Sequence, residues 1–186
     1  MLLPTDVRPF RLTLEDYGLL AEAGAFAGRR VELIEGVIVE VNAETRQHVL
    51  VKNRLSHRLQ AALEAIGAGM EAVVEPTLAL PPHNMPEPDV MIVRTDATER
   101  YFGLADVVMV IEVGVSTLAS DLGLKMRMYA EQGLPEYWVV DVARREVHQF
   151  WTPAGSDYAD TRLVALDGEL RSATVAELAI DGAGIV

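Results

Sequence analysis

The stretch VVMVIEVGVSTLASDLGLKMRMYAEQGLPEYWVVDV, residues 107–142, carries the clearest structural pattern in the chain. It opens with the apolar run 107–113, which fits a buried central strand. Leu118, Leu122, Met126 and Tyr129 then recur at helical spacing over 118–132, and Gly133 with the following proline ends that helix. Residues 136–142 return to an apolar strand. This stretch therefore predicts a strand, a helix and a second strand.

The flanking sequence extends the same pattern in both directions. Residues 89–93 form another short apolar strand, and 45–66 have helical periodicity. Residues 30–41 predict a hairpin that turns at Glu35-Gly36, and 13–24 predict a short helix with Thr13 as its cap. After a turn at 143–145, residues 146–151 complete a second hairpin. The tail, 157–186, predicts one or two edge strands and a short helix near Val175–Leu178.

We expect one α/β (α+β) domain over residues 1–186. Its core, about 30–150, has a central mixed sheet flanked by helices, and 157–186 forms a C-terminal β-extension. No run of 18 uncharged apolar residues predicts a membrane span, and the first residues lack the pattern of a signal peptide. We therefore expect a cytoplasmic protein without a membrane partner.

The net charge of −12 first argues against nucleic-acid binding, because phosphate contacts need Lys and Arg. The charge is uneven, however. Residues 46–58 contain four basic residues and no acid, and Arg54 and Arg58 are predicted to face outward, where a phosphate could meet them. The acidity thus predicts weak, salt-sensitive and metal-dependent binding to DNA rather than none.

Several enzyme classes lack their sequence signatures in this chain. There is no cysteine, which excludes thiol nucleophiles and cysteine-based zinc sites. The phosphate-loop, dinucleotide-binding, serine-hydrolase and zincin motifs do not occur either.

Three ionisable residues do form a suggestive set. Asp89 stands at the start of an apolar strand, Glu112 lies near the end of the next, and Lys125 follows 13 residues later in a helix. A charge in a buried strand is costly unless it is paired or binds a metal. If the two strands are neighbours, the carboxylates converge and can hold Mg²⁺, while Lys125 orients water. Purely structural roles stay open as well: Asp89 as a turn cap, Glu112 paired with Arg127, or an Asp121–Lys125 ion pair.

The helix at 45–66 contributes further polar candidates. His48 and Lys52 fall on the same face as its apolar residues, so both are predicted to point inward. Lys52 and Lys125 are the only lysines beside 14 arginines, and a lysine is a compact, titratable cation. Glu32, in the first hairpin, either reaches His48 or faces solvent.

The order of VELIEGVIVEV, His48, PEPDVMIV, VIEV and STLASDLGLKMRMYAEQGLPEYWVVD resembles the Uma-type restriction endonuclease family of the PD-(D/E)XK nuclease superfamily. The resemblance spans roughly residues 13–150. It implies a catalytic Asp89, an acidic partner at Glu112 and a lysine supplied from the next helix, which matches Lys125. Glu32 and His48 match positions that the family also favours. Val115 departs from the polar residue that many relatives have there.

These observations lead to the hypothesis of an endonuclease that hydrolyses DNA phosphodiesters with Mg²⁺, or Mn²⁺ in its place. Asp89 and Glu112 bind the metal and Lys125 positions or activates water. We expect a homodimer, since double-strand cleavage usually needs two active sites. Two alternatives remain, namely a catalytically silent nucleic-acid-binding or regulatory module and a metal-dependent hydrolase of small phosphoesters.

Overall fold

The computed structural model describes residues 8–95 and 99–186 in two compact units. The smaller unit comprises the chain up to Ala43 together with Ala79–Pro86, and the larger comprises Glu44–Leu78 and Glu87–Val186. The expectation that the chain lacks a signal peptide rests on residues 1–7, which lie outside the described residues. The single domain predicted over 1–186 stays a prediction.

The smaller unit contains one helix and one hairpin. Helix α1 (Leu14–Glu22) begins with a capping box, in which Thr13 and Asp16 exchange side-chain and backbone hydrogen bonds. Strands β1 (Val31–Ile34) and β2 (Val37–Glu40) pair antiparallel. Glu35 and Gly36 between them both have positive φ, as a two-residue hairpin turn requires. The predicted helix and hairpin are therefore confirmed.

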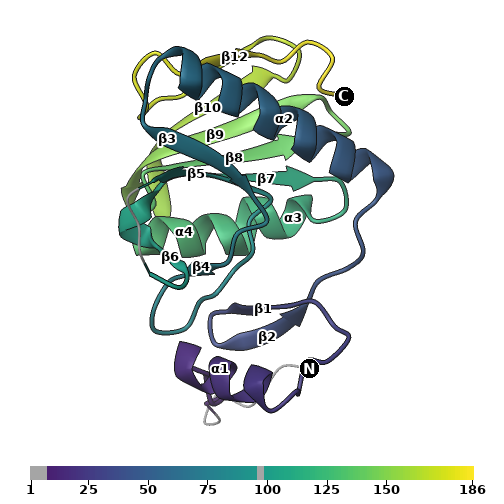
Figure 1. The fold of residues 1–186 in the computed structure, drawn as a ribbon, viewed down its shortest axis with the longest axis vertical. Coiled ribbons are helices and arrows are strands. Elements are labelled where there is room, and N and C mark those ends of the chain that lie inside the picture. Colours follow the sequence, from purple (N-terminus) through teal and green to yellow (C-terminus); the bar gives the residue numbers. More distant parts are fainter. Residues whose placement is uncertain (1–7, 96–98) are drawn as a thin grey trace. The chain divides into compact units, whose positions relative to one another are not determined.

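A six-stranded mixed sheet forms the centre of the larger unit, in the order β10-β9-β8-β7-β5-β3 (Figure 1). Only β7 and β8 run parallel, since the helical segment between them returns the chain to the same end of the sheet. All other neighbours are antiparallel. The predicted mixed sheet is confirmed. Its strands are β3 (Met70–Val74), β5 (Val90–Arg94), β7 (Val107–Gly114), β8 (Glu136–Asp141), β9 (Glu146–Ala154) and β10 (Asp157–Ala165).

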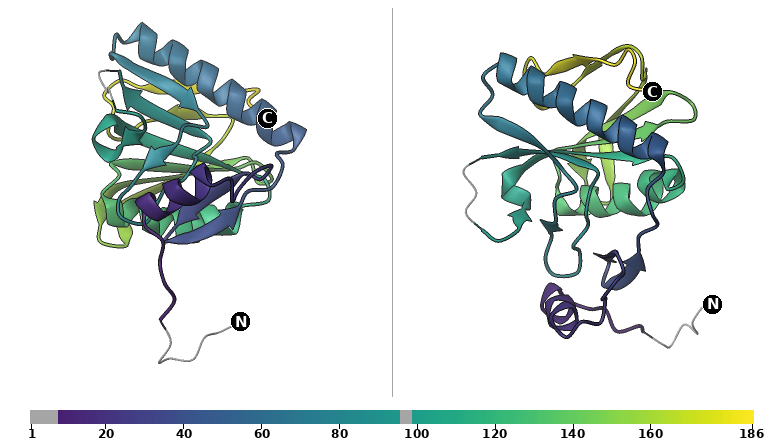
Figure 2. Two further views of the ribbon diagram at one scale, coloured as in Figure 1. Left: turned by 60° about the horizontal axis from the view of Figure 1, so that its bottom comes forward. Right: turned by 45° about the vertical axis from the view of Figure 1, so that its right-hand side comes forward.

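Helices cover both faces of this sheet (Figures 1 and 2). On one face, α2 (Arg46–Ala65) buries Val51, Leu55, Leu59 and Leu63 against alternate strand residues such as Trp138. On the other face lies the segment made of α3 (Leu118–Ser120), the π-helical turn η2 (Asp121–Lys125) and α4 (Met126–Gln132). Tyr129 of α4 contacts Tyr137, the neighbour of Trp138 on β8, with ring centroids 5.0 Å apart.

The π-helical turn changes which residues of the 118–132 helix are buried. An extra residue in one turn rotates everything beyond it relative to a regular helix. Met128, Tyr129 and Ala130 are buried together with Asp121, whereas Leu118, Leu122 and Met126 are half-buried. The predicted helix is correct in extent, but only Tyr129 of its predicted apolar face is fully buried.

The C-terminal segment completes the core beside α2. Strands β11 (Glu169–Arg171) and β12 (Ala179–Asp181) form a small hairpin, and six apolar residues of this segment join the α2 cluster. The helix predicted near Val175–Leu178 is wrong: the chain turns there, and Glu177 has a φ of 64°. The remaining short elements are β4 (Leu78–Ala79), β6 (Phe102–Gly103) and the 3-10 turn η1 (Leu104–Asp106).

The predicted outward arginines of α2 also have different surroundings than expected. Arg54 donates to the carbonyl of Ile185 at 3.1 Å. Arg58 donates to the carbonyls of Asp181 and Ala183, the latter at 2.6 Å. The tail occupies the place where Arg58 was expected to meet a phosphate, so part of the positive charge of α2 serves the fold.

A buried carboxylate fastens the tail to the sheet. Glu136, at the start of β8, is fully buried and accepts hydrogen bonds from the Trp138 indole at 2.7 Å and the Ser172 hydroxyl at 2.7 Å. It also accepts from the amide and hydroxyl of Thr174 at 2.9 and 2.6 Å. Trp138 belongs to β8, and Ser172 and Thr174 belong to the tail. The Glu136 side chain therefore holds the tail and the sheet together.

Replacing this carboxylate should destabilise the protein strongly. We expect Glu136→Ala to lower the free energy of unfolding by about 2–4 kcal/mol, because several buried donors lose their acceptor at once. Glu169→Ala is the matched control: that carboxylate pairs with Arg171 on the surface, and its removal should cost at most about 1 kcal/mol. Urea denaturation measures both, and equal losses would contradict the role assigned to Glu136.

Candidate active site

The pairing of β5 with β7 brings together the two carboxylates singled out in the sequence. Val90 pairs with Ile111 in the antiparallel ladder. Asp89 directly precedes Val90 and Glu112 directly follows Ile111, so the two acidic residues stand at the same end of their neighbouring strands. The backbone amide of Val113 also donates to Asp89 Oδ2 at 2.7 Å. The predicted adjacency of the two strands is confirmed.

Glu112 is buried and contacts the helical segment on its face of the sheet. Lys125 Nζ lies 3.1 Å from Glu112 Oε1, and the Tyr129 hydroxyl donates to the same oxygen at 3.3 Å. Lys125 is the last residue of the π-helical turn, a rare geometry that is frequent at functional sites. The turn thus places the lysine and, four residues on, the tyrosine against one carboxylate.

Asp121 marks the start of this turn. It is buried and accepts a hydrogen bond from the Thr117 hydroxyl at 2.6 Å, while its carbonyl accepts from the Tyr137 hydroxyl at 3.0 Å. These contacts tie the first turn of the segment to β8. They hold the helical segment, and therefore Lys125, at a defined height above the sheet.

Asp89 also contacts the first turns of α2. His48 Nε2 lies 2.8 Å from Asp89 Oδ1 and 3.8 Å from Glu44 Oε1. Helix α2 begins at the Thr45 cap, whose hydroxyl accepts from the His48 amide, so the cap fixes the position of this histidine. Burial lowers the pKa of His48, but the hydrogen bond and charge of Asp89 outweigh it, and the pKa lies above its ordinary value.

Lys52 lies one helical turn beyond His48 and is buried. Its ammonium is 2.5 Å from Glu44 Oε1, 2.6 Å from Glu75 Oε1 and 4.0 Å from Asp89 Oδ1. Burial opposes its charge, yet the hydrogen bonds to the two glutamates prevail and raise the pKa of Lys52. Burial, together with a hydrogen bond shared with Glu75, raises the pKa of Glu44. The predicted inward position of Lys52 is confirmed.

Asp89 belongs to two candidate sets of metal ligands, one predicted from the sequence and one that the structure brings together. One is the predicted pair Asp89 and Glu112, which offers only carboxylate oxygens. In the other, Glu44, His48 and Asp89 each offer one atom, and these atoms all lie within 4.8 Å of one another. Carboxylates suit Mg²⁺ and Mn²⁺, whereas an imidazole shifts the preference towards later transition metals. The donor set around Asp89 fits a divalent cation.

Three residues that contact the predicted site residues were missing from the sequence prediction: Glu44, Glu75 and Tyr129. Glu44 precedes His48 by four residues, a spacing that placed it within reach. Glu75 follows β3 in a left-handed conformation, with φ of 51°, and its amide donates to the carbonyl of Asp89 at 3.2 Å. No local sequence pattern predicts such a contact. Glu32 is buried in β1 of the other compact unit, so its role at the site stays a prediction.

The fold has a counterpart among solved structures. A protein described as a putative nuclease belonging to DUF820, from Anabaena variabilis ATCC 29413, is similar in fold with a TM-score of 0.72. The two sequences are 16% identical, and the alignment covers 94% of this chain and 97% of that one. No curated protein matches the chain. Within the described residues no helix is long and apolar enough to span a membrane.

The family comparison covers nearly the whole chain. The model of the Uma2 family, described as putative restriction endonuclease, matches residues 14–181, which include every residue of the cluster around Asp89 and Glu112. The chain therefore belongs to the Uma2 family, as its sequence motifs suggested.

Proposed function

We propose that this protein is a Mg²⁺-dependent endonuclease that hydrolyses phosphodiester bonds of DNA. The observation that carries the proposal is that Asp89 and Glu112 stand at the same end of two neighbouring strands, with Lys125 3.1 Å from Glu112. Membership of a family described as putative restriction endonuclease supports a nuclease activity. The similar fold of a protein described as a putative nuclease is consistent with it.

In this proposal Asp89 and Glu112 hold the metal. Their oxygens suit Mg²⁺, with Mn²⁺ as an alternative. The bound cation would act as a Lewis acid on a phosphate oxygen and lower the pKa of water. The backbone amide of Val113 keeps one oxygen of Asp89 fixed, which leaves the carboxylate little freedom to turn away.

Lys125 is proposed to orient the attacking water and to offset negative charge in the transition state. The water oxygen forms a bond to phosphorus as the bond to the leaving oxygen breaks. Lys125 is held in reach of this reaction by Glu112 and by the π-helical turn. Tyr129, on the same Glu112 oxygen, keeps that carboxylate in place.

The residues on α2 are proposed to position Asp89 rather than to react. His48 holds Oδ1 of Asp89, and Lys52 keeps Glu44 and Glu75 beside it. Glu32 is retained as a further candidate, because the family resemblance favours this position. A homodimer is part of the proposal, since cleavage of both strands needs two sites, and sedimentation equilibrium measures it directly.

Nicking of supercoiled plasmid in Mg²⁺ or Mn²⁺ tests the activity. We expect Asp89→Ala to reduce nicking to the background rate and Lys125→Ala to reduce it about 100-fold, as for the loss of one transition-state donor. Glu71→Ala is the control, because this exposed carboxylate belongs to β3 of the same sheet but faces solvent. The proposal is wrong if the wild type and Asp89→Ala nick at the same rate.

Titration calorimetry with Mn²⁺ locates the ion in one of the two candidate sets of ligands. We expect binding to the wild type, its loss in Asp89→Ala and Glu112→Ala, and a smaller loss in Glu44→Ala, because Glu44 is occupied by Lys52. The reverse order, with Glu44→Ala losing binding and Glu112→Ala retaining it, would move the ion to Glu44, His48 and Asp89.

The buried ammonium of Lys52 gives a prediction on stability. Lys52→Met leaves two glutamates without their cation, so in EDTA its free energy of unfolding should fall by about 3 kcal/mol. Lys52→Arg keeps the positive charge, so its free energy of unfolding should fall by less. Urea denaturation measures both variants, and a Lys52→Met protein as stable as the wild type would show that Lys52 does not hold the glutamates.

A further inference from the structure

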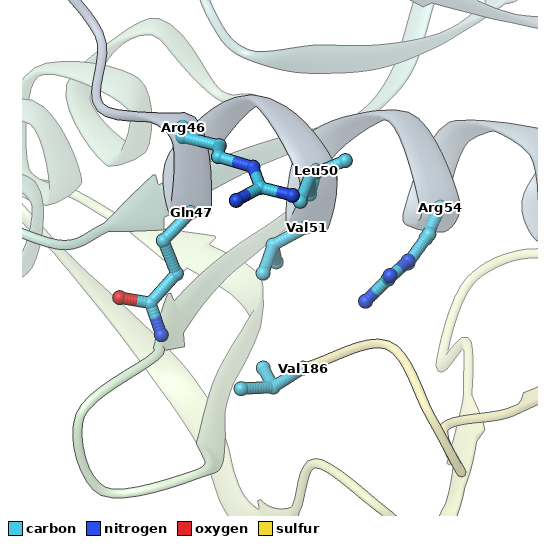
Figure 3. Close-up of a pocket in the computed structure, with 6 residues that line it drawn as sticks. All are labelled: Arg46, Gln47, Leu50, Val51, Arg54 and Val186. Carbon is cyan, nitrogen blue, oxygen red and sulfur yellow. The ribbon is translucent and has the colours of Figure 1, made fainter.

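A pocket lies beside the first turns of α2, next to the end of the tail. Its volume is about 360 Å³, near the lower end of the roughly 300–1,000 Å³ of small-molecule sites. It is lined by Arg46, Gln47, Leu50, Val51, Arg54 and Val186 (Figure 3). Side chains of α2 line one side of the pocket, and Val186 of the tail lines the opposite side.

The pocket combines an apolar interior with a cationic rim. Val51 is buried, Val186 packs against the same core cluster, and Leu50 is an exposed apolar side chain. Arg46 and Arg54 are exposed at the rim, and the bond from Arg54 to the Ile185 carbonyl orients its guanidinium. A ligand that fits has a flat apolar body and an attached anion.

No nearby acid on the helix cancels this charge. Residues 46–58 contain no Asp or Glu, and Glu44, just before the helix, is bound to Lys52. The two arginines can therefore meet a phosphate with paired N–H donors, and a guanidinium plane can stack on a base.

The pocket is also adjacent to the candidate active site along the chain. Gln47 and Val51, which line it, directly precede His48 and Lys52 of the cluster. Neighbouring residues of a helix are separated by a rise of about 1.5 Å and point in different directions. The pocket and the cluster thus occupy different sides of the same two turns of α2.

We propose that this pocket binds one unstacked nucleotide of a single DNA strand, with the base against Leu50 and Val51 and the phosphate on Arg46 and Arg54. The proposal rests on the nuclease function, of which it names a substrate feature. A paired base stays in its stack and cannot enter an apolar pocket, whereas contacts to a duplex backbone need only positive charge. The apolar floor therefore points to a single strand or a frayed end.

Fluorescence anisotropy in EDTA tests the proposal without any hydrolysis. The probe is a labelled oligonucleotide of mixed sequence, alone and annealed to its complement. We expect the single strand to bind more tightly, and Arg46→Glu and Leu50→Asp each to weaken its binding about tenfold or more. Both residues are exposed, so these variants should fold, and their melting temperatures are measured alongside.

Arg127→Glu is the matched control. Arg127 is an exposed helical arginine on α4, which covers the opposite face of the sheet, and the substitution changes the net charge equally. Its effect on binding should stay below about twofold. Equal losses in Arg46→Glu and Arg127→Glu would show that only net charge matters and would overturn the pocket. Unchanged single-strand binding by Leu50→Asp, or an equal effect of Leu50→Asp on the duplex, would overturn it too.

The two proposals fail separately. If Asp89→Ala nicks plasmid like the wild type while Leu50→Asp still weakens single-strand binding, the metal-dependent mechanism is wrong and the pocket stands. If Asp89→Ala abolishes nicking while the wild type does not bind the single strand in EDTA, the pocket is wrong and the nuclease function stands.

Discussion

The antiparallel register between β5 and β7 is the constraint on which the candidate site depends. It sets Asp89 and Glu112 at the same end of the two strands, and the backbone amide of Val113 donates to the Asp89 side chain there. A shift of one residue would turn either side chain to the other face of the sheet. Such a shift would also move Val90 or Ile111, which are fully buried in the core cluster beneath α2, to the face that carries α4. The burial of apolar neighbours therefore protects the geometry of two polar ones.

Placing charges in this core requires that each be compensated. Glu112 has Lys125 and Tyr129, while Lys52 has Glu44 and Glu75. Removing one partner of such a group costs more than the pair contributes, because the remaining charge stays buried. Asp89 lies between the two sets, with His48 at one of its oxygens and the backbone amide of Val113 at the other. Asp89 thus connects α2 to the central strands.

The extent to which the site could be predicted follows from how local each signal is. Asp89, Glu112 and the inward side of Lys52 were predictable, because strand and helix periodicities determine which way a side chain points. The role of Glu75 was not, since it depends on a left-handed residue after β3 and on a partner 23 residues away in sequence. The π-helical turn was also hidden, because the spacing of Leu118, Leu122 and Met126 matches a regular helix. The prediction of a helix in the tail failed for a related reason. Glu136 binds residues 172–174 and holds this segment in a turn that has no local sequence signature.

The net charge of −12 is only partly a property of the surface. In the part of the chain that the structure describes, five acidic residues are buried: Glu32, Glu112, Asp121, Glu136 and Asp141. The positive charge available on residues 46–58 is reduced in the same way, because Lys52 is buried between Glu44 and Glu75 and Arg58 binds the tail. Arg46 and part of Arg54 remain on the outer side of α2. Since two guanidinium groups release few counterions, long-range attraction to a polyanion is small. In the proposed function, affinity for DNA therefore has to come from short-range contacts, namely a bridging cation at Asp89 and an apolar surface that a base can cover.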